Sequence, residues 1–202
     1  MKKLLLAAFG PFGGETTNPA LEAVRLVPDR VAGAEVVRLE LPVSFARAGE
    51  VLMSAVRAER PDVALCVGQA AGRACVSVEQ VAINLIEARA ADEDGVRPQG
   101  VPIVEDGPAA FFATVPVGAM AEAARAAGVP AQVSYTAGTY VCNAVMYQLL
   151  WGLERELPGA RGGFVHVPYA PAQVVGKPAG TPSMALADEA RALVAAAEAA
   201  LA

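Results

Sequence analysis

The sequence predicts an α/β fold, a single-domain α/β/α sandwich in which helices cover both faces of a mostly parallel, twisted central sheet. Segments with strand patterns alternate with segments of helical periodicity from one end of the 202 residues to the other. Several of the strand segments are almost wholly apolar, as is typical of parallel strands buried on both faces. No internal repeat or linker interrupts the alternation, so residues 1–202 are treated as one domain.

The first half of the chain begins with an apolar strand over Lys3–Phe9. Asn18 and Pro19 then supply an N-cap and a proline at the first helical position, which predicts a helix over Ala20–Val27. The remaining elements predicted in this half are a strand over Val36–Leu41, an amphipathic helix over Ser44–Arg60 that Pro61 ends, a buried strand over Val63–Gly68 and an extended segment over Val76–Leu85.

The second half opens with a polar, irregular excursion over Ala91–Asp106. Loops of that length are more often lids, binding loops or subunit contacts than spacers. The regular elements predicted after it are a helix over Val117–Ala127, a strand over Ala131–Tyr135, a helix over Tyr140–Glu156, a core strand over Gly163–Val167 and an alanine-rich helix over Ser183–Ala202.

The composition excludes several classes of protein. Hydrophobic residues make up 54% of the chain and charged residues 18%, which argues against disorder and predicts enough apolar surface for a homo-oligomer. The net charge of −5 excludes the basic surface of a nucleic-acid binder. The first apolar run is too short for a signal peptide, and no run approaches the ~18 apolar residues of a membrane span. We therefore expect a soluble, cytoplasmic protein without nucleic-acid or membrane partners.

The cysteines and the histidine limit the chemistry. Three cysteines, at positions 66, 75 and 142, fit no disulfide framework, and a single histidine excludes an ordinary Cys/His zinc site. The glycine-rich turn over Gly10–Gly14 lacks the spacing of a phosphate-binding loop. We expect reduced thiols and no metal or nucleotide cofactor.

Cys142 is the candidate nucleophile, because Ala137-Gly138-Thr139 precedes it and a helical pattern follows. A thiol at a helix N-terminus beside a histidine can have its pKa lowered from ~8.5 toward ~3.5–7.5. We therefore expect Cys142 to be a thiolate at neutral pH, with a small packing residue as the alternative. Cys66 lies inside an apolar strand and no helix begins after Cys75, so both are interpreted as packing residues.

His166 and Glu79 are the candidate partners of Cys142. His166 stands at the carboxyl end of a buried strand, where open α/β sheets form their ligand crevices. No other side chain titrates near neutrality, so His166 is the base or there is none. Glu79 lies in an otherwise apolar segment and could orient the imidazole, since a buried carboxylate is costly unless paired. A core histidine and a glutamate at a solvated edge are the alternatives.

Phe9 and Phe12 bracket the glycine-rich turn that follows the first strand. Two aromatic rings at such a position suit a flat, uncharged ligand rather than a phosphate. Packing of both rings against the sheet is the alternative.

Five segments of the chain form a pattern that extends over nearly its whole length. They are Phe9-Gly10-Pro11-Phe12-Gly13-Gly14-Glu15-Thr16 with Asn18-Pro19, Gly68-Gln69-Ala70-Ala71-Gly72-Arg73, Val78-Glu79-Gln80-Val81-Ala82-Ile83-Asn84, Ala137-Gly138-Thr139-Tyr140-Val141-Cys142-Asn143, and Phe164-Val165-His166-Val167-Pro168-Tyr169. In content and order they resemble the type I pyroglutamyl peptidases, also called pyrrolidone carboxyl peptidases. The length of the chain agrees with that family.

The resemblance implies a single catalytic domain that removes an N-terminal pyroglutamyl (5-oxoprolyl) residue from peptides and assembles as a homo-oligomer, either a dimer or a tetramer. It implies a cysteine peptidase without metal or cofactor, which acts through a thioester acyl-enzyme. Cys142 matches the nucleophile, His166 the base and then acid, and Glu79 the orienting carboxylate, while Arg89 matches an arginine near the oxyanion. The positions that match the pocket for the lactam ring are Phe9, Phe12, Asn18, Gln69, Tyr140 and Val141.

Four residues depart from the pattern of the family. Gly10 replaces an acidic residue, Ala71 a glycine, Tyr140 a phenylalanine and Ala90 a larger aliphatic side chain. These changes alter the shape of the pocket rather than the triad, so they affect the expected substrate affinity more than the type of reaction.

A function of another class is a non-catalytic α/β protein that binds a small cyclic amide or a nucleoside-like ligand at the Phe9 and Phe12 turn. Cys142 would then be merely structural. Release of an amine from a pyroglutamyl amide, blocked by a thiol alkylator, separates the two functions.

Overall fold

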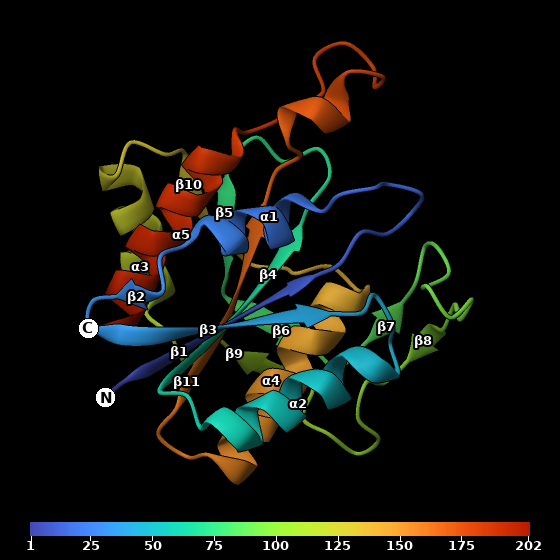
Figure 1. Ribbon diagram of the computed structural model, residues 1–202. Helices are drawn as coiled ribbons and strands as arrows, with labels where there is room; N and C mark the ends of the chain where they lie inside the picture. Colours follow the sequence, from blue (N-terminus) through green and yellow to red (C-terminus); the bar gives the residue numbers. More distant parts are fainter.

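The computed structural model describes residues 1–202 and has a seven-stranded central sheet with helices on both faces (Figure 1). The strand order is β10-β5-β11-β4-β1-β3-β2. Within it, β1 pairs in parallel with β3 and β4, β11 with β4, and β10 with β5, whereas β5 against β11 and β2 against β3 are antiparallel. This architecture confirms the predicted fold class.

The predicted strands and helices are present, and four short strands that the sequence did not indicate are added to them. The strands of the central sheet are β1 (Lys3–Phe9), β2 (Arg30–Val31), β3 (Ala34–Leu41), β4 (Val63–Gln69), β5 (Val76–Glu79), β10 (Ala131–Ser134) and β11 (Arg161–Val167). Two small two-stranded sheets pair β6 (Val81–Ile83) with β9 (Ala110–Phe112) and β7 (Ile86–Glu87) with β8 (Gln99–Val101). The helices are α1 (Pro19–Leu26), α2 (Arg47–Glu59), α3 (Val117–Ala126), α4 (Val141–Glu156), α5 (Leu186–Leu201) and the short 3₁₀ helix η1 (Pro171–Val174).

Two hydrophobic cores lie on the two faces of the sheet. Successive residues of a strand point to opposite faces, so Leu4 and Leu6 of β1 belong to the core under α1, α3 and α5, and Leu5 and Ala7 to the core under α2 and α4. All four are fully buried. Figure 1 shows the two groups of helices on either side of the sheet. None of the helices combines the length and the apolar character that crossing a bilayer requires.

A local signal in the sequence sets the start of α1. The Asn18 side chain accepts a hydrogen bond from the backbone N–H of Ala20 (3.0 Å) and caps α1, as the sequence predicts. The predicted helix from Ser44 begins three residues later, at Arg47, after a turn in which the Ser44 hydroxyl accepts from the Arg47 N–H (3.1 Å).

The predicted extended segment Val76–Leu85 is divided in the structure. It breaks at Gln80, whose N–H donates to the Ser134 carbonyl while its own carbonyl accepts from the Ala113 N–H. The part before the break, β5, joins the central sheet, and the part after it, β6, pairs with β9. Glu79 is therefore the last residue of a central strand and lies at the edge where the sheet ends.

Candidate active site

A cleft of about 750 Å³ lies where β4 and β11 end and α4 begins. Carboxyl ends of parallel strands commonly form the ligand crevice of α/β sheets. The cleft is lined by Cys142 and His166, which the sequence analysis paired, and by Arg73 and Arg89. Glu79 lies behind His166 and does not reach the surface.

The register of β5 against β11 brings Glu79 to His166. The strands run antiparallel, with Glu79 opposite Phe164 and Ser77 opposite His166. The Glu79 carboxylate, which is 0% exposed, accepts a hydrogen bond from His166 Nδ1 at 2.7 Å. The same oxygen, Oε1, also accepts from Arg73 Nη1 at 2.6 Å. Glu79 is thus a paired, buried carboxylate rather than a residue at a solvated edge.

The charges of this group follow from its surroundings. Burial favours the neutral form of Glu79, but the interactions with His166, the hydrogen bond from Ser134 and the nearby positive charge of Arg73 together outweigh it, and the pKa of Glu79 lies below its ordinary value. Burial lowers the pKa of His166, so the imidazole is neutral at pH 7. Since an ionised carboxylate can only accept, Nδ1 carries the imidazole proton and Nε2 keeps the lone pair that a base needs.

Cys142 is the second residue of α4 and is half-buried. Burial raises the pKa of its thiol to about 12, and the negative charge of Glu79 acts in the same direction. The expectation of a thiolate at neutral pH is therefore wrong, although the helix N-terminus is where it was predicted. The helix amides favour an anion, but loss of solvent around the sulfur costs the thiolate more.

The first amide groups of α4 are available for an anion beside the sulfur. The N-cap residue Tyr140 makes no side-chain hydrogen bond to them, and the first backbone bond of the helix is from the Ala144 N–H to the Tyr140 carbonyl. The N–H groups of the first helical turn have no partner within the helix. They can stabilise negative charge that forms on a substrate oxygen next to Cys142.

Gly68 makes room for the sulfur on β4. A Cβ atom at this position would lie 3.0 Å from Cys142 Sγ and 2.9 Å from the ring of Phe164. Both distances are shorter than van der Waals contact allows. A side chain here would have to displace Cys142 or the ring of Phe164.

A second, smaller cavity of about 60 Å³ adjoins the cleft at Cys142. All six residues for which the resemblance implies a role in the pocket line it, and Val43 and Cys142 complete it. They are Phe9, Phe12, Asn18, Gln69, Tyr140 and Val141. The walls are mostly aromatic and aliphatic, and the polar groups are side-chain amides, the Tyr140 hydroxyl and the thiol.

The two amides of the cavity are held by other contacts. The Asn18 amide nitrogen donates to the Gly10 carbonyl (2.9 Å) while its oxygen caps α1, so this side chain also shapes the turn that carries Phe12. The Gln69 amide oxygen accepts from Gln173 (3.0 Å) in the η1 segment, which leaves its NH₂ group for a ligand.

Tyr140 connects the wall of the cavity to the excursion after β7. Its hydroxyl donates to the Ala91 carbonyl at 3.0 Å, and the ring of Phe45 packs edge-on against it with centroids 5.2 Å apart. A phenylalanine at this position, as the resemblance implies for the family, would lack this hydrogen bond. The departure at Tyr140 therefore adds a polar link between the start of α4 and the loop.

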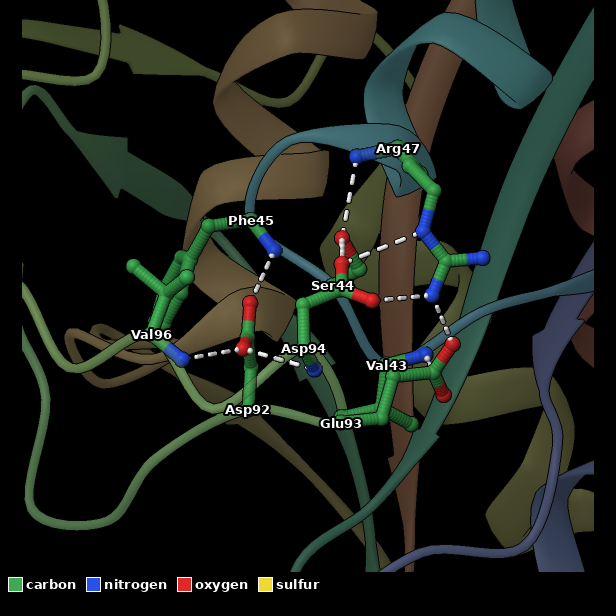
Figure 2. Close-up of polar contacts among 8 residues, drawn as sticks. All are labelled: Val43, Ser44, Phe45, Arg47, Asp92, Glu93, Asp94 and Val96. Atoms are coloured by element: carbon green, nitrogen blue, oxygen red, sulfur yellow. Dashed lines mark hydrogen bonds and ion pairs between the residues drawn. The ribbon is translucent and has the colours of Figure 1, made fainter.

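The acidic turn Asp92-Glu93-Asp94 fixes the same loop to the start of α2 (Figure 2). Asp92 accepts from the backbone N–H groups of Phe45 (2.9 Å) and Val96 (2.8 Å). Arg47 forms ion pairs with Glu93 and Asp94. The first part of the predicted excursion thus contacts both Tyr140 in the cavity wall and the start of α2.

Arg89 lies in the cleft but contacts none of the catalytic candidates. Its side chain is exposed and makes no hydrogen bond or ion pair within the chain. The structure places it on the same cleft as Cys142, where a bound substrate could reach it. Ala71 and Ala90, two of the residues that depart from the family pattern, also line this cleft.

Sequence reasoning assigned no role to Arg73 or Gly68. Arg73 stands at the end of a motif that the sequence analysis quoted, six residues before Glu79, and the need of a buried carboxylate for a counter-ion was a signal that could have found it. Gly68 gave no signal, because the close approach of the sulfur depends on the packing of α4 on β4. The structure contains no group of three or more side chains that could hold a metal ion.

Comparison with known proteins gives concordant results. The model of the pyroglutamyl peptidase family matches residues 2–202. A pyrrolidone-carboxylate peptidase of Levilactobacillus brevis is 51% identical over 194 residues, which are 96% of this chain and 95% of that protein. One of Erwinia tasmaniensis is 50% identical over 188 residues, covering 93% and 87% of the two chains.

Two solved structures have the same fold. Pyroglutamyl peptidase I of Bacillus amyloliquefaciens superimposes with a TM-score of 0.94 at 44% identity, over 99% of this chain and 97% of that one. The pyrrolidone carboxyl peptidase of Thermococcus litoralis gives 0.95 at 39% identity, over 100% and 94%. The family model and the relatives cover essentially the whole chain, so this chain belongs to the pyroglutamyl peptidase family and is an enzyme of that family.

Proposed function

We propose that this enzyme removes the N-terminal pyroglutamyl residue from peptides as a cysteine peptidase with Cys142, His166 and Glu79 as its triad. The observation that carries the proposal is that the cleft and the small cavity meet at the sulfur of Cys142. Cys142 lines both the open cleft that contains His166 and the small cavity with aromatic walls. A ring bound in the cavity would leave the following peptide bond next to the thiol.

The cavity suits a neutral lactam. A pyroglutamyl residue has no free ammonium group, so its recognition needs apolar contacts and hydrogen bonds rather than a counter-charge. No aspartate or glutamate lines the small cavity, while Phe9, Phe12 and Tyr140 offer rings and Gln69 offers a free amide NH₂. An N-terminal residue with a charged amine would lose its hydration there without a partner.

The chemistry begins from a neutral thiol and a neutral imidazole. As Cys142 Sγ forms a bond to the pyroglutamyl carbonyl carbon, its proton moves to Nε2 of His166. Glu79 stabilises the imidazolium that results, because its Oε1 accepts the hydrogen bond of His166 Nδ1–H, with 2.7 Å between Oε1 and Nδ1. The carbonyl oxygen becomes an oxyanion, which the amides at the start of α4 can stabilise, together with Arg89.

The second half of the reaction reverses these roles. The C–N bond breaks, and His166 gives its proton to the leaving amine of the shortened peptide. A thioester between Cys142 and the pyroglutamyl group remains. Water, deprotonated by His166, attacks the thioester carbonyl, and pyroglutamate leaves as the thiol is restored.

A turnover assay with a pyroglutamyl amide against prolyl and glutamyl amides tests the proposal. We expect release of the amine from the pyroglutamyl compound only, and loss of that release in Cys142→Ala and His166→Ala. Cys75→Ser is the matched control, since Cys75 lines neither cavity, and should retain activity. Turnover that survives in Cys142→Ala, or equal rates on the prolyl amide, would refute the proposed function.

A further inference from the structure

Arg73 makes two contacts that hold its guanidinium at the back of the cleft. It lies in the turn between β4 and β5, where Nη1 donates to Glu79 Oε1 at 2.6 Å and Nη2 donates to the Thr136 carbonyl at 3.1 Å. Its side chain is 25% exposed, whereas that of Glu79 is 0% exposed. The cation therefore stands between solvent and the buried carboxylate.

The groups that face the Glu79–His166 pair are few. Arg73 approaches from the turn after β4, Cys142 from α4, and the hydroxyl of Ser134 from β10. The thiol of Cys142 is neutral and the hydroxyl carries no charge. Because His166 is itself neutral at pH 7, Arg73 is the one permanent charge that balances Glu79.

We propose that Arg73 is a positioning residue that keeps the Glu79–His166 pair free of an additional proton at neutral pH, so that His166 remains available as a base. The proposal rests on the proposed function for the role of His166 in the reaction. It goes beyond the triad in assigning to Arg73 the control of the protonation state of two of its members.

The net charge of Arg73, Glu79 and His166 is the same whichever of Glu79 and His166 holds the shared proton. With Arg73 present, ionised Glu79 and neutral His166 give a net charge of zero for the three side chains. Without Arg73, the same state leaves an uncompensated negative charge in a buried site, which is costly. A proton added to either group restores neutrality, so the proton affinity of the pair must rise.

The two hydrogen bonds through Glu79 Oε1 set the scale of the effect. They place the guanidinium roughly 5 Å from His166 Nδ1. A unit charge at about 5 Å corresponds to about two pH units at an effective dielectric constant of ~20. Partial exposure of Arg73 reduces this figure, so we expect a rise of about one pH unit or more.

Titration of the imidazole by NMR measures the proton affinity of the Glu79–His166 pair directly, because His166 is the only histidine of the chain. In untagged protein, the midpoint in Arg73→Gln should rise by about one pH unit or more. In Arg73→Lys, which keeps the charge, it should move by less than half as much. Arg161→Gln is the matched control, since it removes a positive charge from the far end of β11 and should leave the midpoint unchanged.

A midpoint in folded Arg73→Gln equal to that of the unsubstituted protein overturns the inference, as does an equal rise in Arg161→Gln. The acid limb of the pH profile of kcat/KM should move with the NMR midpoint. An NMR midpoint that rises while the acid limb stays in place would instead overturn the role of His166 as base, which belongs to the proposed function.

The stability of a double variant covers the case in which Arg73→Gln does not fold. If the defect is an uncompensated carboxylate, adding Glu79→Gln removes it, and the double variant should show a cooperative thermal transition that Arg73→Gln alone lacks, or a higher Tm where the single variant is partly folded. A double variant that is no more stable than the single one would mean that Arg73 acts through packing, and the inference would fail.

Discussion

Glu189 in α5 is fully buried, and neither of its carboxyl oxygens has a hydrogen-bond partner. Burial raises its pKa from an ordinary value of 4.5 to about 8. The folded protein therefore binds this proton more tightly than the unfolded chain does. The resulting contribution to stability is fully present below pH 4.5 and is lost as the pH rises toward 8.

The size of the effect follows from the two pKa values. The interval from 4.5 to about 8 corresponds to about 5 kcal/mol over the whole range. Between pH 6 and pH 8 the free energy of unfolding should fall by about 2 kcal/mol from this group alone. In a chain of this length, that is a decrease in Tm of about 4–8 °C.

Urea unfolding of the unsubstituted protein and of Glu189→Met, at pH 6, 7 and 8, isolates this contribution. Methionine has a similar shape and does not ionise. The free energy of unfolding of the variant, minus that of the unsubstituted protein, should therefore increase by about 2 kcal/mol from pH 6 to pH 8. Titration of His166 affects both proteins equally and cancels in the difference. Glu198→Met, at an exposed site on the same helix, is the control and should show no such growth.

A difference between the unsubstituted protein and Glu189→Met that is constant across this range would refute the reasoning. It would mean that Glu189 is already ionised, or already solvated, in the folded protein. An equal growth in Glu198→Met would assign the pH dependence to some other group.

Four further predictions concern the cleft and the cavity. Because burial raises the pKa of Cys142, its alkylation by iodoacetamide in a Cys75→Ser background should still accelerate between pH 7 and pH 10, whereas a rate that is constant from pH 6 would show a thiolate. Glu79→Gln should lower kcat by up to about four orders of magnitude with little change in KM, since the amide cannot stabilise an imidazolium, and an unchanged kcat would remove Glu79 from the triad. Phe12→Ala should lower kcat/KM at least about tenfold, mainly through KM, with unchanged alkylation of Cys142, and a large drop in Tm with a uniform loss of activity would assign the ring to packing instead. Gly68→Ala should lower kcat far more than it changes KM, because its Cβ would lie 3.0 Å from the sulfur, and full activity in this variant would show that the sulfur has room to move.

Much of the fold could be predicted because it depends on local patterns. Alternating and continuous apolar runs marked the strands, and the Asn18 cap with Pro19 marked the start of α1. The positions of Cys142 at a helix start and of His166 at the end of a core strand followed from the same patterns. These properties are set by residues within a few positions of one another, so the sequence carries them directly.

The tertiary structure decided the properties that depend on partners far apart in the chain. The break at Gln80 and the antiparallel register of β5 against β11 bring Glu79 to His166, 87 residues away. Arg73 reaches the same oxygen from the turn between β4 and β5, six residues before Glu79. The pKa of Cys142 depends on how much solvent reaches the sulfur and on the charge of Glu79, and the sequence alone predicted its direction wrongly. The sequence determines which chemical groups are present and on which elements they lie, whereas their protonation depends on burial and distance, which exist only once the chain has folded.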